Sequence, residues 1–339
     1  MPSTNVHATA PRGVHGSGYR AVVEPVPWRE AWHDALYGSH GFYRATVGPA
    51  GHFTTSTHRP LGAVLAQAVA RLAEREGLSH VVDVGAGRGE LLCALGVVRP
   101  DLRLTGVDVV DRPADLPPSA GWLVSPGGAE LPDTLNDLED VLVIAHEWLD
   151  VVPCTVAEVI APGRLATVLV DLLTGEESLG AAPDGADLAW CELHWPLEGL
   201  PVGSRVEVGR TRDAAWSGLV ARVRRGAVLA VDYGHTRRDR PQRGSLTGYR
   251  EGVVVAPVAD GSCDLTAHVA VDSLERDEIM TQREALHGLA VHALTPDHEL
   301  SRTDPAAYLG ALSRSSAALA LTAVPGLGGF RWVLRRVST

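Results

Sequence analysis

The sequence predicts a doubly wound α/β fold around a mostly parallel sheet. Two apolar runs of strand length, residues 141–145 and 227–231, have no polar face, and such runs are typical of parallel strands that are covered on both sides. Residues 81–84, 90–98 and 102–109 have the pattern of a strand, a helix and a strand, a unit whose connection should be right-handed. With 45% hydrophobic residues among 339, the chain can bury a substantial core.

The N-terminal part of the chain predicts a tail followed by one long helix. Residues 1–18 are rich in Gly, Ser, Thr and Pro without periodic apolar positions, which predicts a flexible tail. Residues 59–76 carry apolar positions at helical spacing. Thr55, Ser56 or Thr57 could provide the N-cap of that helix. The apolar stripe consists of Leu61, Val64, Leu65, Ala68, Val69 and Leu72.

The middle of the chain predicts an antiparallel excursion from the parallel sheet. Residues 155–160, 166–171 and 204–208 alternate as short strands with connections rich in Gly and Pro. A helix over 212–224 would lead back into the sheet, and residues 330–337 would close it. The predicted organisation is a core of residues 19–153 and 227–339, with an inserted lobe and its connecting helix at 154–226.

Composition removes several classes of enzyme. All 30 basic residues are arginine, and the chain contains no lysine. A Walker P-loop, a pyridoxal enzyme, a Schiff-base aldolase and a protein kinase each need a lysine. The sequence therefore excludes these four chemistries, whatever codon bias produced the composition.

Cysteine usage and charge point to a cytoplasmic protein without metal. The four cysteines, Cys93, Cys154, Cys191 and Cys263, lie far apart and form no zinc or disulfide pattern. No apolar run approaches the roughly 18 residues of a membrane span, so we expect no membrane association. A net charge of −11 argues against a nucleic-acid partner, and it is compatible with a cationic substrate.

A glycine-rich turn after the first predicted parallel strand indicates a small cofactor. An apolar strand ends at Asp83 and opens into Gly85, Gly87 and Gly89. Glycine suits a turn that needs positive φ or lets a ligand approach the backbone. The spacing is Gly-x-Gly-x-Gly rather than the nicotinamide pattern Gly-x-Gly-x-x-Gly. The alternative is a strand–turn–helix connection that binds nothing.

A second acid favours S-adenosyl-L-methionine over NAD. Asp108 closes the next apolar run, 25 residues after Asp83 and 19 after Gly89. This is where a doubly wound sheet places the carboxylate that accepts the ribose hydroxyls. Asp83, in turn, suits a cofactor with a cationic amino-acid moiety.

The segment directly after residues 141–145 carries two candidate catalytic acids. It lies at the carboxyl end of the sheet, where open α/β folds bind ligands. If it opens a helical turn, Glu147 and Asp150 share one face and could clamp a guanidinium or accept a proton. The alternative is that both acids only cap the first turn of that helix.

Two further segments carry polar residues of possible function. Over residues 264–269, strand alternation would place Asp264, Thr266 and His268 on one face. His268 could orient a substrate or carry a proton, or the segment could form a hydrogen-bonded structural corner. Asp232 and Tyr233 end the strand of residues 227–231, again at the carboxyl edge of the sheet.

Several widely separated motifs resemble the MidA-like class I methyltransferases. That family includes the mitochondrial complex I assembly factor that methylates an arginine. The resemblance extends from about residue 40 to 295 and implies a seven-stranded, Rossmann-like, S-adenosyl-L-methionine-dependent enzyme that acts on a protein. The motifs are Gly-Pro-Ala-Gly-His-Phe-Thr-Thr-Ser at 48–56, the turn at 83–89, His-Glu-Trp-Leu-Asp-Val-Val-Pro at 146–153, Val-Asp-Tyr-Gly-His at 231–235, Gly-Ser-Leu-Thr-Gly-Tyr-Arg at 244–250 and Asp-Leu-Thr-Ala-His-Val at 264–269.

The resemblance also implies site residues. Glu147 and Asp150 would face the substrate, and Asp83, Gly85, Gly87 and Gly89 would lie along the cofactor. The sequence itself adds His268 to the catalytic candidates. It adds to the cofactor candidates Ala86 in the glycine turn, Asp108, His146, and Thr54 and Thr55, which precede the first helix and could fold over the cofactor. The chain departs from the usual family pattern at Asp83, Ala86, His146 and Trp148. It is also shorter than usual between residues 109 and 141, which would alter the walls of the substrate pocket.

The sequence thus predicts a cytoplasmic methyltransferase that transfers a methyl group to an arginine nitrogen of a protein. A small-molecule O- or N-methyltransferase and a non-catalytic S-adenosyl-L-methionine-binding assembly factor are the alternatives. The sequence also leaves open a homodimer.

Overall fold

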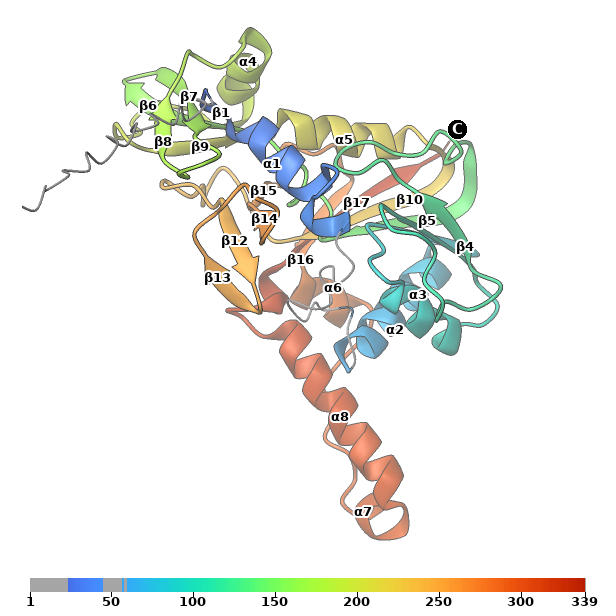
Figure 1. The fold of residues 1–339 in the computed structure, drawn as a ribbon. Helices are drawn as coiled ribbons and strands as arrows, with labels where there is room; N and C mark the ends of the chain where they lie inside the picture. The colour runs from blue at the N-terminus through green and yellow to red at the C-terminus, as the bar shows by residue number, and fades with distance from the viewer. Residues whose placement is uncertain (1–23, 45–56, 58–59, 339) are drawn as a thin grey trace, which may run out of the picture.

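The centre of the protein is a seven-stranded, mostly parallel sheet (Figure 1). The computed structural model describes residues 24–44, 57 and 60–338. In spatial order the strands are β16 (Glu278–Thr281), β17 (Arg331–Val337), β10 (Val223–Asp232), β5 (Leu138–His146), β2 (His80–Val84), β3 (Arg103–Asp108) and β4 (Gly121–Val124). β17 is antiparallel to both of its neighbours, β16 and β10, and the other pairings are parallel.

Alternating strand residues bury both faces of this sheet. Val81 and Leu142 pack with α2 (Leu61–Arg75) and α3 (Glu90–Val98) in one apolar cluster. Their neighbours in sequence, such as Val82 and Val143, pack with α5 (Arg210–Val220) in a second cluster on the other side. This two-sided burial explains why the runs at 141–145 and 227–231 contain no polar positions. The mixed α/β fold is therefore confirmed, while its doubly wound path stays a prediction.

A smaller antiparallel sheet follows β5 along the chain. Its strands β6 (Thr155–Ala161), β7 (Arg164–Val170) and β9 (Arg205–Val208) match the predicted excursion. The N-terminal strand β1 (Val26–Pro27) and the short β8 (Glu177–Leu179) add to it, and α4 (Gly185–His194) lies between β8 and β9. The predicted domain limits themselves stay predictions.

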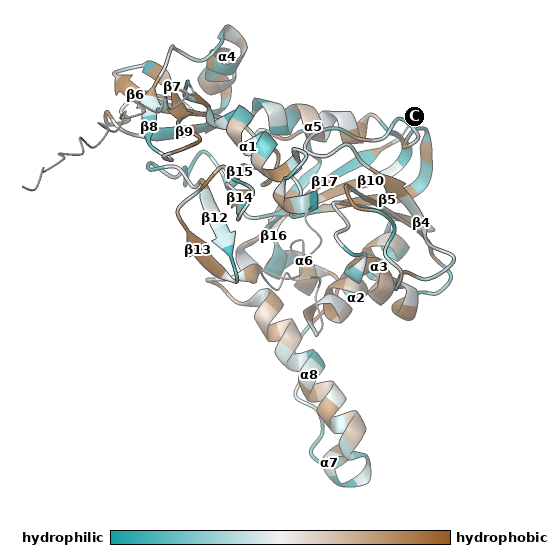
Figure 2. Cartoon of the chain, viewed as in Figure 1, coloured by the Kyte–Doolittle hydropathy of each residue, from teal (hydrophilic) through white to brown (hydrophobic). Residues whose placement is uncertain are grey.

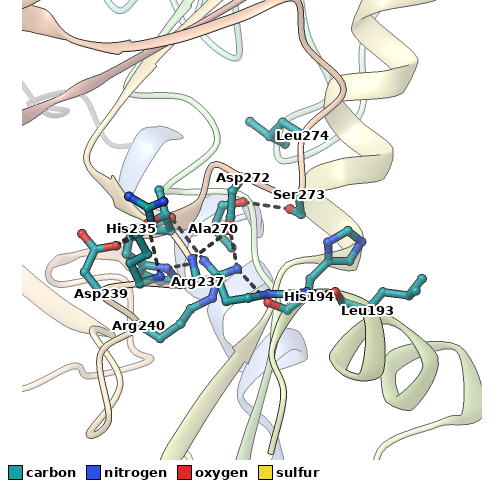
Figure 3. A network of polar contacts seen from close by, with 12 residues as sticks. Leu193, His194, His235, Arg237, Asp239, Arg240, Ala270, Asp272, Ser273 and Leu274 are labelled. Carbon is teal, nitrogen blue, oxygen red and sulfur yellow. Dashed lines mark hydrogen bonds and ion pairs between the residues drawn. The ribbon is translucent and has the colours of Figure 1, made fainter.

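A polar network joins the end of α4 to the main body (Figure 3). The guanidinium of Arg240 donates to the backbone oxygen of His194 at 2.8 Å and to Asp272 Oδ1 at 2.7 Å. It also contacts His235 Nδ1 at 2.8 Å and lies 5.1 Å from the centre of the Trp195 ring. His235 belongs to β11 (Gly234–His235), which pairs with β15 (Val269–Ala270). This network therefore joins the C-terminal end of α4 to the segments around β11 and β15.

The C-terminal third contributes a hairpin sheet and a helical arm. β12 (Thr247–Arg250) lies between β13 (Val253–Val255) and β14 (Asp264–Thr266). After α6 (Gln282–Gly288), α7 (Leu300–Thr303) and α8 (Pro305–Thr322) extend away from the body (Figure 1). Figure 2 shows hydrophobic and hydrophilic residues mixed along this arm. Among the described residues no helix is long and apolar enough to cross a membrane.

Helix ends and sheet edges are where the sequence predictions fail. The helix predicted at 59–76 begins at Leu61 after Pro60, which makes no side-chain cap, so the capping role of Thr57 is wrong. Thr55 and Ser56, like the predicted tail at 1–18, lie outside the described residues. The helix predicted at 212–224 runs from 210 to 220, because residue 223 already pairs in the sheet. Residues 331–337 join the sheet as predicted, but β16 forms its edge.

A glycine in the centre of the sheet provides a test of this packing. Gly226 has φ +150°, and a Cβ there would lie 2.1 Å from the backbone oxygen of Val141. We expect Gly226→Ala to lower the free energy of unfolding by about 2–4 kcal/mol through strain and overpacking. Gly218→Ala in α5, where a Cβ meets nothing within 4 Å, should instead stabilise by roughly 0.5–1 kcal/mol. Urea denaturation of both variants measures the contrast, and equal stabilities would contradict it.

Candidate active site

A cavity of about 1620 Å³ opens at the carboxyl ends of the central strands. The residues that end β2, β3 and β5 line it, together with Tyr233 directly after β10. Most predicted site residues meet here. They are Asp83, Gly85, Ala86, Gly87, Asp108, His146, Glu147, Asp150 and His268.

The turn after β2 has the backbone conformation that its glycines predict. Gly85, Gly87 and Gly89 have φ values of +74°, +59° and +77°. Trp148 lies beneath the first of them, because a Cβ on Gly85 would meet the Trp148 side chain at 3.5 Å. Gly89 is the N-cap of α3 and lies against Leu116. The turn is thus open to the cavity on one side and packed on the other.

Backbone amides hold the carboxylate of Asp108 at the cavity. The N–H of Gly87 donates to Oδ2 at 2.8 Å, and the N–H of Val109 donates to Oδ1 at 2.7 Å. A carboxylate has about four lone-pair sites, so it can still accept ligand hydroxyls. Burial raises the pKa of Asp108 to about 6, although these backbone donors act in the opposite direction.

Asp83 is a buried acid that faces the cavity and other acids. Burial raises its pKa well above the usual value, and the nearby carboxylates of Asp108 and Glu90 raise it further. A cationic amino-acid moiety beside Asp83 would relieve this electrostatic cost. Together with the open glycine turn and the Asp108 acceptor, this arrangement fits S-adenosyl-L-methionine.

Glu147 occupies a strained position immediately after β5. Its φ is +51°, an uncommon value for a residue with a side chain, and its N–H donates to the backbone oxygen of Val231 at 2.8 Å. No helix follows, so the predicted helical face shared with Asp150 is wrong, and so is the helix-capping alternative. Strain of this kind concentrates at functional sites.

The imidazole of His146 lies beside the Glu147 side chain. His146 Nδ1 lies 3.3 Å from Glu147 Oε1. Burial lowers the pKa of His146 to about 4, so the ring is neutral near pH 7. A neutral ring carries no charge, so the two side chains are neighbours and do not form an ion pair.

Asp150 is buried and holds a pair of hydroxyl groups. The hydroxyl of Thr266 donates to its Oδ2 at 2.6 Å, and Tyr233 donates to the same oxygen. Burial raises the pKa of Asp150, although these hydroxyls lower it in part. Its other oxygen, Oδ1, has no hydrogen-bond partner among the described residues. Asp150 therefore positions the Tyr233 hydroxyl at the cavity wall.

Asp232 fixes the loop that carries these acids. Its Oδ2 accepts the backbone N–H groups of Leu149 and Asp150 at 3.1 and 3.2 Å. Burial raises its pKa, and the charges of Asp150 and Glu147 act in the same direction. Asp232 is thus a structural support behind the site.

The segment at 264–269 is two short strands and not one. β14 ends at Thr266 and β15 begins at Val269, so the alternation predicted to include His268 is wrong. Asp264 accepts the hydroxyl of Tyr43 at 2.7 Å, and burial raises its pKa to about 8. His268 lies at the cavity, 5.4 Å from the ring of Tyr233, and burial lowers its pKa.

A buried arginine joins the segments around the site. Arg212, which is 1% exposed, donates to the backbone oxygens of Val152 at 3.0 Å, Asp150 at 2.8 Å and His268 at 2.9 Å. Its guanidinium lies 5.4 Å from the centre of the Trp32 ring in α1 (Trp28–Tyr37). It holds the site loops through their backbone and leaves the acid side chains to face the cavity.

Arg212 and most aromatic residues of the cavity wall carry no local signal in the sequence. Tyr37, Tyr43 and Phe330 line the cavity because distant contacts bring them there, whereas Tyr249, which also lines it, belongs to the motif at 244–250. Thr54 and Thr55 lie outside the described residues. Within the described ranges, no group of His, Cys, Asp or Glu could hold a metal ion.

The role of Arg212 can be tested by stability. Arg212→Met should lower the free energy of unfolding by about 3–5 kcal/mol, because three buried carbonyl groups lose their donor. Arg224→Met, shortly after the same helix, removes an exposed pair with Asp137 and should cost less than about 1 kcal/mol. Urea denaturation compares them, and a loss below 1 kcal/mol for Arg212→Met would show that other contacts hold the loops.

Comparisons with known proteins agree with this geometry. A family model described as "Putative S-adenosyl-L-methionine-dependent methyltransferase" matches residues 122–289. A crystal structure from Burkholderia thailandensis bound to S-adenosyl-homocysteine has a TM-score of 0.69 at 20% identity and covers 91% of this chain and 87% of that one. A second crystal structure, of an uncharacterized protein from the same organism, has a TM-score of 0.70 at 21% identity. The match covers 92% of this chain and 87% of that one.

No curated protein matches the sequence. The two crystal structures share the fold with this chain, and the family match covers β4 to α6, including Glu147, Asp150 and His268. The motifs, the glycine turn and the family match agree with one another. The chain is thus similar to the MidA-like S-adenosyl-L-methionine-dependent methyltransferases, with the family match extending over residues 122–289.

Proposed function

We propose that the protein transfers a methyl group from S-adenosyl-L-methionine to an arginine nitrogen of a substrate protein. The observation that carries the proposal is the charge of the cavity wall. Among the described lining residues are eight acids and two arginines, Arg44 and Arg88. A wall of this kind favours a cationic acceptor over a neutral or anionic one.

The raised pKa values of the buried acids support the same acceptor. Burial raises the pKa values of Asp150 and Asp264, so ionising either group in the empty cavity is unfavourable. A guanidinium that enters supplies the missing positive charge and favours the ionised carboxylates. Arginine is planar and always protonated, so it suits a site with carboxylates and aromatic faces together.

The chain's own residues divide the work of the reaction. The cofactor supplies an electrophilic methyl group on a sulfonium. Asp83 and Asp108 would hold its amino-acid and ribose parts. Glu147 would orient the guanidinium and accept its proton as the nitrogen loses it. Asp150 acts through Tyr233, whose hydroxyl it positions.

The pH dependence of cofactor binding tests Asp108. Because its pKa is raised to about 6, the carboxylate becomes protonated as the pH falls through 6 and loses acceptor capacity. Affinity for S-adenosyl-homocysteine should therefore weaken between pH 7 and pH 5, by up to about tenfold per pH unit. Asp108→Asn should bind about 10-fold or more weakly at pH 7 and lack this part of the pH dependence.

Calorimetry at several pH values measures this effect. Asp101→Asn is the matched control. Asp101 is an exposed residue just before the start of β3, at the end of the strand opposite to Asp108, and it pairs with Arg99. Unchanged affinity in folded Asp108→Asn would remove Asp108 from the cofactor site.

Glu147→Gln tests catalysis separately from binding. The substitution keeps the shape of the side chain and its strained backbone but removes the proton acceptor. Methyl transfer should fall by about 10²-fold or more, while S-adenosyl-homocysteine affinity and melting temperature stay nearly unchanged. Glu139→Gln, at the exposed opposite end of β5, should transfer methyl groups like the wild type.

The assay is transfer of a labelled methyl group to proteins in a lysate of the source cells, followed by mass spectrometry of the modified residue. Label on arginine supports the proposal. Label only on small molecules would favour a small-molecule methyltransferase. Binding of S-adenosyl-homocysteine without any transfer would favour a non-catalytic assembly factor.

A further inference from the structure

The hairpin beside the cavity has an unpaired edge. In the three-stranded sheet of the order β13, β12, β14, strand β13 pairs with β12 alone among the described strands. Its residues Val253 and Val254 are each 61% exposed. An exposed apolar edge strand is a liability that proteins usually cover or charge. Its presence at an active-site rim therefore calls for an occupant.

This edge is continuous with the cavity wall. Tyr249 in β12 lies opposite Val254 on one side and opposite Asp264 of β14 on the other. Residues directly opposite one another in antiparallel strands point to the same face. Asp264, Tyr249 and Val254 therefore form one row across the sheet, and the first two of these line the cavity.

The backbone of Val254 faces the free side. Glu251 and Gly252 form a two-residue loop with φ values of +51° and +77°, as in a type I′ turn. Such a loop closes on a hydrogen-bonded pair, here Arg250 and Val253. Because hydrogen-bonded and non-hydrogen-bonded pairs alternate, the N–H and C=O of Val254 point away from β12.

We propose that β13 binds an extended, arginine-bearing segment of the substrate protein by strand addition, with Val254 as the central backbone contact. This inference rests on the proposed function and names the form in which the substrate arrives. A strand that pairs with β13 extends the row of Asp264, Tyr249 and Val254 by one position. A side chain at that position lies on the face that borders the cavity.

Charge on the hairpin and in the cavity suits a cationic segment. Glu251 is exposed at the tip of the hairpin, and Gly252 beside it lines the cavity. Burial raises the pKa of Tyr249, and the nearby charges of Asp150, Glu147 and Asp264 raise it further. Main-chain pairing would supply affinity, and the acids would select arginine among the side chains presented.

Val254→Pro tests the backbone contact. Proline removes the outward N–H, but an edge strand tolerates it because that N–H makes no bond to β12. We expect labelling of protein arginine to fall about tenfold in kcat/KM, the scale of a lost backbone contact. Val254→Thr keeps the branched shape and the N–H, and it should stay within about twofold of wild type. Both variants should keep the wild-type melting temperature and affinity for S-adenosyl-homocysteine.

Failure of this inference differs from failure of the proposed function. If wild type labels no arginine, the proposed function fails. If wild type labels arginine and Val254→Pro labels it equally well, strand addition is overturned while the function stands. An equal loss in Val254→Thr also overturns it, because the backbone would then not be the contact.

Two further measurements complete the test. A nine-residue peptide around the labelled arginine should be a better substrate than free arginine, and N-methylation of its backbone amides beside the arginine should abolish the difference. Sedimentation should show the same oligomeric state for wild type and Val254→Pro. Dissociation of a dimer by the proline would assign the edge to a second copy of the chain and overturn the proposal.

Discussion

The geometry of the site depends on one buried cation. Arg212 reaches from α5 to backbone oxygens of Asp150, Val152 and His268, and it lies against Trp32 of α1. These groups come from three separate parts of the chain, so a single guanidinium replaces the regular secondary structure that the loop after β5 lacks. Burying a charge is costly unless its donors are satisfied, and here carbonyl groups satisfy three of them. Because Arg212 binds carbonyls rather than carboxylates, the acids remain available to the cavity.

The availability of these acids gives the cavity its electrostatic character. Asp83, Asp150 and Asp264 are buried, no residue in the described part of the chain forms an ion pair with them, and burial raises the pKa of each. Protonation relieves the cost of desolvating these acids, and positive charge that enters the cavity instead favours their ionised form. Both the cofactor and the proposed acceptor carry such charge. Ligand binding and ionisation of these acids are therefore coupled. A neutral molecule of the same shape would bind to this site more weakly than a cationic one.

The sequence predicts those parts of the fold that depend on neighbours in the chain. The limits of α3 are correct because Gly89 begins the helix and the residues before Pro100 end it, and the runs at 141–145 and 227–231 indicate strands covered on both faces. Contacts across the fold leave no such pattern. Tyr43 reaches the cavity through a hydrogen bond to Asp264, 221 residues away in the chain, and Arg212 looks like an ordinary residue of a surface helix. The helix predicted after residue 146 fails for a related reason: Asp232 and Arg212 satisfy the backbone groups of that loop, which then needs no helical hydrogen bonds.

The strain at Glu147 follows from the same supports. Its N–H is held by Val231 on the neighbouring strand, and its carboxylate lies beside the neutral ring of His146. A residue in the left-handed region costs about 1–3 kcal/mol, so the loop would relax if Asp232 and Arg212 did not hold the residues that follow. This conformation keeps Glu147 in the cavity wall, whereas a regular helix after β5 would carry its side chain along a helix face. The carboxylate proposed to receive the proton is therefore placed by contacts that lie behind the site, out of reach of the substrate.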